Sequence, residues 1–381
     1  MSIRAKEPAA SKVGRRKASA ALKPIRLVEP APEDRAVVTS YDVAQLAGVS
    51  QSAVSRCFRD GASISEKMRI RVMKAAHELG YAPDAIARSL STRRSNLVAV
   101  VISNLTNLYY PEVLSELNLR LAERNVHLLL FTLQNESDVD RILNQIWQYR
   151  VDGVIAAARL SAQQVKEFEA RGVPLVFYNR YLRERSVNAV CCDQIEAART
   201  IVSGLLDAGH RSFGIIAGPP DSTVGEERTR GCVDTLKRYK NHQYIVVRGD
   251  YTYSGGQRAF TEIIARLGEK PQAVICSNDV MALGCLDAAR FDHGMSIPED
   301  LSVVGFDGVE PANWSSYQLA TIRQPVQRMA EAAVTLLLDC VSDPSRPAEK
   351  RVFSGLLVQG RSARLQKPTK LPRRGSTKEE S

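Results

Sequence analysis

The stretch that decides the fold lies at residues 41–56 and reads YDVAQLAGVSQSAVSR. We expect a helix over Ser40–Ala47, because Thr39 stands before it as an N-cap and Asp42 follows three residues later as an acidic form of the capping box. Gly48 then supplies a turn, since the residue past a helix end often needs a positive φ. The first helix is therefore short, with a defined end.

Two further helices complete a small helical unit. A helix over Gln51–Phe58 follows the cap Ser50, and two short helices joined by a tight glycine turn form a helix-turn-helix. A third helix, Glu66–Leu79, carries Val72 and Ala76 on one side, where they can pack under the first two helices. The sequence therefore predicts an all-α helix-turn-helix head.

From Asn96 onward, short apolar runs alternate with amphipathic stretches. The runs are Leu97–Ile102, Val126–Leu133, Gly153–Ala157, Pro174–Tyr178, Val187–Cys192, Phe213–Ala217, Tyr244–Val247, Ala273–Cys276 and Ser302–Phe306. Helical stretches between them include Pro111–Arg124, Asp193–Ala208, Glu226–Tyr239, Ser254–Leu267 and Asp279–Phe291. Such alternation argues for parallel sheets covered on both faces. About nine or ten strands suit two doubly wound lobes, with a ligand cleft at the carboxyl ends of their strands.

Charge is unevenly distributed along the chain. The net charge is about +5 for residues 1–37, +4 for 38–95, −4 for 96–360 and +5 for 361–381. A head that binds a polyanion, joined to a nearly neutral sensor, would have this pattern. A basic tail alone is weaker support, because such tails are often only solvated.

Composition argues against a membrane or exported protein. No apolar run reaches the length of a membrane span, and Met1–Ala36 lacks the apolar segment of a signal peptide. The seven cysteines are odd in number and lack C-x-x-C spacing, which fits reduced thiols in the cytoplasm. The pair Cys191–Cys192 could be redox-active, although small core residues at a strand end are the favoured interpretation. We expect a cytoplasmic, nucleoid-associated protein with no cofactor or metal.

An enzyme on the same core is a second hypothesis. It would need a nucleophile–base pair or a metal constellation. The five histidines show no H-x-x-x-H spacing, and neither G-x-x-x-x-G-K-[ST] nor G-x-G-x-x-G after a first strand occurs. Catalysis is therefore not expected.

Several motifs occur in a fixed order. The first is YDVAQLAGVS at 41–50, which continues as VSR at 54–56. The motifs that follow are GYAP at 80–83, VDGVI at 151–155, GHR at 209–211, Arg228 three residues before Gly231, SND at 277–279, GFD at 305–307 and TIRQP at 321–325. This ordered set resembles the lactose-repressor/galactose-repressor (LacI-type) family of bacterial transcription regulators over about residues 38–360.

The resemblance implies a division of the chain and a function. It predicts the helix-turn-helix domain at 38–82, a hinge helix and linker at 83–95, and a two-lobed, periplasmic-binding-protein-like effector and dimerisation domain at 96–361. Composition alone predicts a disordered basic arm at 1–37 and a disordered basic tail at 362–381, which the resemblance does not explain. The expected function is a repressor that binds palindromic operator DNA as a homodimer and responds to a sugar, sugar acid or phosphosugar. A periplasmic-type sugar-binding protein is the alternative, and the fused head argues against it.

The head should read DNA through the start of its second helix, which enters the major groove in this motif. That start presents Gln51, Ser52 and Ala53, with Ser55 and Arg56 one turn on. Glutamine can pair with adenine and arginine with guanine. The candidate contacts of the head are Thr39, Tyr41, Ser50, Gln51, Ser52, Ser55 and Arg56. A cap without DNA contact is the alternative for Ser50, and a phosphate clamp is the alternative for Arg56.

Residues 84–91 resemble the family's hinge helix. The resemblance implies that Ala87 and Leu90 meet the minor groove at the operator centre, with Leu90 wedged between bases. Arg88 is a further candidate contact. The alternative for Leu90 is packing on the sensor domain.

The resemblance also places an effector site between the lobes. Its best candidates are Arg228 and Asp279, a guanidinium opposite a carboxylate that could clamp neighbouring hydroxyls. A helix N-cap is the alternative role for Asp279, and a salt bridge to Glu226 or Glu227 is the alternative for Arg228.

Further effector candidates are weaker. The family's Asn-Pro-Phe-Phe appears here as Asn107-Leu108-Tyr109-Tyr110, which keeps aromatic rings but adds hydroxyls. Arg180 ends a strand and could donate to the ligand. For Asp193, Asp307 and Trp314 a structural role is favoured. Two arginines near one pocket would suit an acidic ligand, and a neutral sugar remains the alternative.

Overall fold

The computed structural model describes residues 38–58, 62–82, 94–103, 107–133, 138–220 and 222–366. The expected basic arm, the hinge segment 84–91 and residues 367–381 of the expected tail lie outside the described residues. The expectation of a disordered tail from residue 362 is wrong at its start, because Ser362 is fully buried and donates to the Val303 carbonyl at 2.6 Å. The chain divides into two compact units, Met1–Asp84 and Ala85–Ser381.

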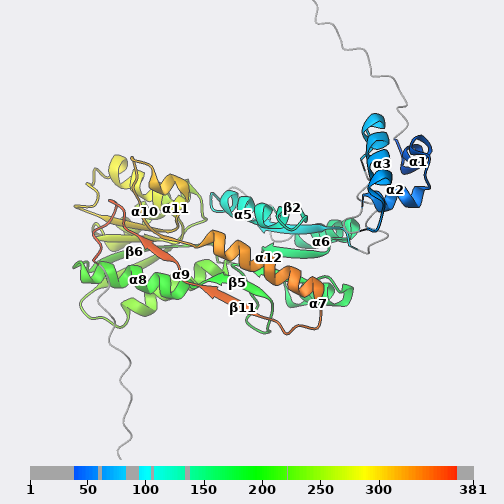
Figure 1. The fold of residues 1–381 in the computed structure, drawn as a ribbon. Coiled ribbons are helices and arrows are strands. Elements are labelled where there is room, and N and C mark those ends of the chain that lie inside the picture. The colour runs from blue at the N-terminus through cyan, green and yellow to red at the C-terminus, as the bar shows by residue number, and fades with distance from the viewer. Residues whose placement is uncertain are drawn as a thin grey trace, which may run out of the picture. The chain divides into compact units, whose positions relative to one another are not determined.

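The first unit contains the three predicted helices, α1 (Ser40–Ala47), α2 (Gln51–Cys57) and α3 (Glu66–Leu79) (Figure 1). The capping box of α1 is present, because the Thr39 N–H and hydroxyl both donate to the Asp42 carboxylate, at 2.7 and 2.8 Å. The expected positive φ at Gly48 is observed, at 60°. Helix α2 ends one residue earlier than predicted.

A small apolar core holds these helices together. Val43 of α1, Val54 of α2 and Val72 of α3 are fully buried against one another. One expectation about α2 is wrong, because Ala53 is also buried, at 4% exposure. Its methyl group therefore packs into the head and is not presented at the surface with Gln51 and Ser52.

The second unit contains two sheets, as the sequence predicts, but each has six strands, so the expected nine or ten strands were too few. Lobe 1 has the order β11-β5-β4-β3-β1-β2 and lobe 2 the order β12-β10-β9-β8-β6-β7. All neighbouring strands are parallel except β10 and β12. The strands are β1 (Leu97–Ser103), β2 (His127–Leu133), β3 (Gly153–Ala157), β4 (Leu175–Tyr178), β5 (Ala189–Cys192), β6 (Ser212–Ala217), β7 (Gln243–Arg248), β8 (Ala273–Cys276), β9 (Ser302–Asp307), β10 (Ala320–Arg323), β11 (Lys350–Phe353) and β12 (Leu356–Val358).

Helices cover both faces of each sheet. They are α5 (Tyr110–Ala122), α6 (Val139–Tyr149), α7 (Ala162–Arg171), α8 (Gln194–Asp207), α9 (Thr223–Leu236), α10 (Tyr253–Leu267), α11 (Asp279–Asp287) and α12 (Val326–Ser342), with short η2 (Ala288–Asp292) and η3 (Glu310–Asn313). The buried residues of α5 and α12 share one core cluster with α10 and α11, whereas α6 and α7 form a second and α8 and α9 a third. Both lobes are therefore doubly wound. None of the helices in the described ranges has the length and apolar character needed to cross a bilayer.

The chain passes between the lobes three times. Lobe 1 takes β1–β5 and then β11, and lobe 2 takes β6–β10 and then β12. Helix α12 follows β10 of lobe 2 but packs on α5 and β3 of lobe 1. Because of these crossovers, the carboxyl ends of the two sets of parallel strands face a common cleft.

Candidate functional site

A small polar cavity lies between the lobes. Its volume is about 40 Å³, and its lining comes from both lobes: Asn107, Tyr109, Tyr110, Tyr178, Asn179, Arg180, Ser222, Val224, Arg228, Tyr251, Asp307 and Gln324. Six of the effector candidates named from the sequence are among them, including Asp307, for which a structural role was favoured. The lining segments follow strand ends, as expected for parallel sheets.

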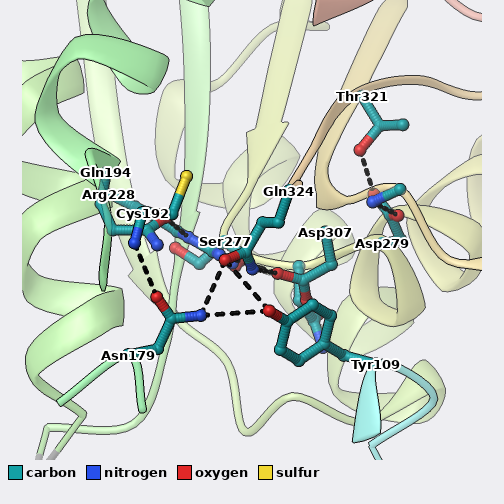
Figure 2. Close-up of polar contacts among 12 residues, drawn as sticks. Tyr109, Asn179, Cys192, Gln194, Arg228, Ser277, Asp279, Asp307, Thr321 and Gln324 are labelled. Carbon is teal, nitrogen blue, oxygen red and sulfur yellow. Dashed lines mark hydrogen bonds and ion pairs between the residues drawn. The ribbon is translucent and has the colours of Figure 1, made fainter. Parts of the chain in front are cut away.

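Arg228 of α9 lies at the base of this site and is only 2% exposed. Its Nε donates to Gln194 Oε1 at 2.7 Å, its Nη1 to the Ser277 carbonyl at 2.6 Å and its Nη2 to Asp307 Oδ1 at 2.7 Å (Figure 2). Burial alone would lower the pKa of Arg228, but the Asp307 carboxylate outweighs it and keeps the pKa above its usual value. Arg228 is thus a charged residue in a buried ion pair.

The salt-bridge alternative for Arg228 had named the wrong partners. Glu226 instead pairs with Arg183 at 3.1 Å, and Glu227 accepts a hydrogen bond from the Tyr181 hydroxyl. Both contacts join the loop after β4 in lobe 1 to α9 in lobe 2. They therefore bridge the lobes at the rim of the cleft.

A chain of hydrogen bonds links the lobes inside the cavity. Asn179, after β4, donates to Gln324 Oε1 at 2.7 Å, and the Tyr109 hydroxyl donates to the same oxygen at 3.3 Å. Gln324 Nε2 then donates to Asp307 Oδ1 at 2.8 Å, beside Arg228 (Figure 2). Since Asn179 belongs to lobe 1 and Asp307 to lobe 2, a change in the spacing of the lobes would break this chain.

Two tyrosines complete the polar wall. The hydroxyl of Tyr178 is fully buried near that of Tyr109, and burial raises the pKa of Tyr178 above its usual value. Tyr251 donates to or accepts from Ser222 Oγ at 2.7 Å. A Cβ at Gly218 would lie 2.4 Å from the Tyr251 hydroxyl, so glycine is required there for Tyr251 to line the cavity.

Asp279 does not line the cavity. It is fully buried, and its oxygens accept from the Gly308 N–H at 2.7 Å, the Val309 N–H at 2.9 Å and the Thr321 hydroxyl at 2.5 Å. The N-cap of α11 is Asn278, so Asp279 is not that cap either. Burial, reinforced by the nearby Asp307 carboxylate, raises the pKa of Asp279 to about 8. The carboxylate opposite Arg228 is that of Asp307.

Two other candidates lie outside the cavity and have local roles. Asp193 is the N-cap of α8 and accepts from the Glu196 N–H at 3.0 Å. Trp314 is half exposed, and its Nε1 donates to Glu310 at 2.7 Å. These contacts agree with the structural role that the sequence favours for both.

The cavity also contains residues that the sequence analysis did not select. They are Tyr178, Asn179, Ser222, Val224, Tyr251 and Gln324. Gln324 stood within the quoted TIRQP motif, and Asn179 immediately precedes the candidate Arg180. Position after the predicted strand Pro174–Tyr178 could have identified Asn179, whereas Gln324 follows β10, which the sequence analysis did not predict.

On the head, the surface of α2 carries most of the predicted DNA-contacting side chains. Ser52, Ser55 and Arg56 are exposed and Gln51 is half-buried. Gln51 Nε2 donates to Ser40 Oγ at 3.1 Å, which fixes the amide across from α1. Ser50 caps α2 by accepting from the Ala53 N–H at 3.2 Å.

Two further predicted DNA contacts of the head, Thr39 and Tyr41, lie at the start of α1. Tyr41 is 72% exposed, and Thr39 is exposed beside it. Ala87, Arg88 and Leu90 lie outside the described residues.

The cysteines behave as core residues. All seven are free and buried. Burial raises the pKa of Cys191 to about 12 and that of Cys192 to about 11, which disfavours the reactive thiolate. No group of three or more histidine, cysteine, aspartate or glutamate side chains in the described ranges could hold a metal ion.

A helix-turn-helix head joined to a two-lobed ligand-binding core defines the class of one-component transcription regulators. Residues 39–84 match the family described as "Bacterial regulatory proteins, lacI family", and residues 202–363 match "Periplasmic binding protein-like domain". The HTH-type transcriptional repressor CytR of Escherichia coli (strain K12) is 31% identical over 314 residues, which cover 81% of this chain and 91% of CytR. The chain belongs to the LacI family of bacterial regulatory proteins.

Solved structures agree with this assignment. The lac repressor dimer bound to operator and the anti-inducer ONPF is 27% identical, with a TM-score of 0.77 over 85% of this chain and 98% of that one. The complex of the transcriptional regulator CelR with cellobiose is 29% identical, with a TM-score of 0.65 over 85% of this chain and 99% of that one.

Proposed function

We propose that this protein is a transcriptional repressor that binds palindromic operator DNA as a homodimer, and that a small carbohydrate-like ligand between its lobes changes its operator affinity. The observation that carries the proposal is the buried polar cavity, whose hydrogen-bonded side chains come from both lobes. Relatives of the same architecture are named as repressors, and two are solved with operator or cellobiose. A repressor acting on operator DNA would work at the nucleoid, and we propose no catalytic role.

The proposed domains are the arm at 1–37, the head at 38–82, the hinge and linker at 83–95, the two-lobed core at 96–366 and the tail at 367–381, because Ser362 and Leu365 pack on the core. The proposed DNA contacts are Thr39, Tyr41, Ser50, Gln51, Ser52, Ser55, Arg56, Ala87, Arg88 and Leu90. In the head, the exposed side chains of α2 support direct contact with base edges. Because Gln51 is already held by Ser40, its amide is oriented before DNA arrives, which lowers the entropic cost of binding.

The proposed ligand contacts are the predicted residues that line the cavity, Asn107, Tyr109, Tyr110, Arg180 and Arg228. Asp307, for which the sequence favoured a structural role, is also proposed as a ligand contact, because it lines the cavity and pairs with Arg228. Asp279, Asp193 and Trp314 are proposed to support the fold, because their polar atoms are already bonded to neighbouring groups outside the cavity.

The proposed mechanism links the cavity to the spacing of the lobes. A volume of about 40 Å³ is too small for a sugar, since ligand sites typically measure hundreds of cubic ångströms. A ligand that fills this cavity must therefore move the lobes or displace the hydrogen bonds through Gln324. It alters DNA affinity only to the extent that it binds one lobe arrangement better than the other.

Dimerisation is supported by exposed apolar side chains on both lobes. Leu119 of α5 and Leu130 of β2 are 48% and 41% exposed in lobe 1, and Phe291 of η2 is 79% exposed in lobe 2. Contact with a second copy of the chain would remove such side chains from water, which is favourable. A two-fold dimer would match the two halves of a palindrome.

The proposal is tested with the full chain and labelled DNA from upstream of its own gene. Fluorescence anisotropy at moderate ionic strength should show tighter binding to a palindrome in that region than to a scrambled duplex of equal length. Gln51→Ala should abolish most of the difference, whereas Gln45→Ala, an exposed residue on α1, should retain it. Equal affinity of the unmodified protein for palindromic and scrambled DNA would refute the proposed function.

A further inference from the structure

A second cavity lies on lobe 1, at the edge of the sheet opposite the cleft. Its volume is about 410 Å³, and part of its lining comes from segments that lead into strands: Arg94 before β1, Val151 and Asp152 before β3, and Val173 and Pro174 before β4. In a parallel sheet the starts of the strands share one edge and their carboxyl ends share the other. This cavity is therefore separate from the site between the lobes.

The charged residues of this lining are three arginines and one carboxylate: Arg94, Arg150, Arg171 and Asp152. Asp152 is engaged by the chain that leads into β1. Its Oδ1 accepts from the Ser95 N–H at 2.8 Å and the Ser95 hydroxyl at 2.9 Å, and its Oδ2 accepts from the Asn96 N–H at 2.9 Å. These bonds hold the neighbouring Arg94 beside the cavity. Three positive charges against one negative charge leave a net charge of +2, so the cavity suits an anion.

Two of the arginines have no carboxylate partner among the described residues. Arg150 follows α6 and Arg171 ends α7, and both side chains are exposed. The Arg171 guanidinium lies over the Trp147 ring, 4.7 Å from its centroid, and a guanidinium stacked on a ring can still donate hydrogen bonds from its edge. The helix dipole favours a cation at the end of each helix, but it does not explain why both arginines converge with Arg94 on one cavity.

The linker brings DNA within reach of this cavity. Twelve residues lead from Ala82, the last described residue of the head, to Arg94, and a chain of that length spans at most about 43 Å when fully extended. Duplex DNA presents one phosphate charge for about every 1.7 Å of its axis. An open cavity with exposed guanidiniums suits such a backbone phosphate, because arginine can pair with it through two N–H groups.

Resting on the proposed function, we propose that this cavity is a phosphate site through which lobe 1 itself binds the DNA backbone, in addition to the contacts of the head. Arg150 and Arg171 donate to the phosphate oxygens, and Arg94 adds a third positive charge. Phosphate contacts carry no sequence information, so the site raises the affinity for any duplex and leaves the preference for operator unchanged. Its contribution falls as salt rises, because binding releases counterions from the DNA.

The salt dependence of DNA binding tests the proposal on the full chain. Fluorescence anisotropy gives Kd for palindromic and scrambled duplexes over a range of KCl concentrations. Each phosphate contact that is lost lowers the slope of log Kd against log salt by about 0.9. The double variant Arg150→Gln/Arg171→Gln should therefore lower the slope by about 2, one phosphate for each protomer of the proposed dimer. Its affinity should fall by about 10-fold at low salt, by the same factor on both duplexes.

Two further double variants separate the site from the total charge. Arg141→Gln/Arg159→Gln removes the same charge from exposed arginines of lobe 1 that stand near the carboxyl ends of β2 and β3, and it should keep the slope. Arg150→Lys/Arg171→Lys retains the charge of the cavity and should keep most of the slope. An unchanged slope in the folded Arg150→Gln/Arg171→Gln variant, or an equal loss in the Arg141→Gln/Arg159→Gln control, would overturn the proposal.

A small free anion is the competing occupant of the cavity. Inorganic phosphate is the probe, and thermal unfolding of the unmodified chain and of Arg150→Gln/Arg171→Gln is compared with and without it. If phosphate stabilises only the unmodified chain while the salt slopes of the two proteins agree, the cavity binds a free anion and the DNA contact is wrong. The slope on scrambled duplex tests the contact even where no palindrome is preferred. Failure of the proposed function and failure of this contact are therefore distinguished.

Discussion

Removing the charge of Asp307 tests how the core holds its buried cation. Asp307→Asn preserves the shape of the side chain, and asparagine tolerates the positive φ of 111° at this position. The amide oxygen can still accept from Arg228 and Gln324, so mainly the charge is lost. Breaking a buried ion pair by removing one partner costs roughly 3–5 kcal/mol, because the other charge is left uncompensated. Since the hydrogen bonds persist, we expect a loss near the lower end, about 3 kcal/mol of unfolding free energy.

A double-mutant cycle separates the pairing from other effects. Arg228→Met should also destabilise the protein, by leaving Asp307 unpaired, whereas the double variant should recover much of the loss. Urea unfolding is followed by tryptophan fluorescence, because the two tryptophans report on different lobes, Trp147 in α6 and Trp314 after η3. The Trp147→Phe background isolates lobe 2.

The matched control is the exposed ion pair of Arg258 and Asp250. Its atoms also approach to 2.7 Å, but the side chains are 66% and 46% exposed. Asp250→Asn should therefore cost about 1 kcal/mol or less. The reasoning is refuted if Asp307→Asn costs no more than Asp250→Asn, or if the effects of the Arg228 and Asp307 changes simply add.

Three further outcomes are expected. The folded pKa of Asp279, about 8, lies above its unfolded value, so the free energy of unfolding should fall as pH rises from about 4 to 8. In urea titrations, Asp279→Asn, whose amide can donate to Thr321, should remove up to about 1.4 kcal/mol per pH unit of that slope. Ser50→Ala removes the cap bond to the Ala53 N–H and should lower the stability of the isolated head by about 1 kcal/mol, measured by thermal circular dichroism. Leu90→Ser should weaken binding to operator far more than binding to random duplex in gel shifts, and equal losses on both would remove the wedge hypothesis.

Local patterns predicted much of the fold because they encode local physics. The caps and glycine turns of the head predicted α1 and α3 to the residue, and each of the nine predicted apolar runs overlaps a strand. The crossover segments were missed. Strands β10, β11 and β12 have only four, four and three residues, and the partly exposed β11 and β12 form sheet edges, so they lack a continuous apolar run.

The site was predicted less completely, for a reason that Asp279 and Asp307 illustrate. Both follow neighbouring strands of one sheet, and both stand in family-like motifs. Only the turn after β9 decides between them, because the N–H groups of Gly308 and Val309 both point at Asp279. These hydrogen bonds hold the Asp279 carboxylate outside the cavity, whereas the Asp307 carboxylate lies beside Arg228. The sequence analysis identified both carboxylates and the edge of the sheet at which they lie. The direction in which each carboxylate points depends on contacts between segments about thirty residues apart.

The position of Gln324 explains how so small a cavity could control a larger change. Gln324 stands between β10 of lobe 2 and α12, which begins at Val326 and packs on lobe 1. Its amide accepts from Asn179 of lobe 1 and donates to Asp307 of lobe 2. A ligand hydroxyl that replaced either contact would therefore act on a covalent crossover between the lobes. Because α12 is packed against β3 and β4, its start cannot shift without moving lobe 1 as a body, so a local exchange of hydrogen bonds becomes a displacement of the lobe.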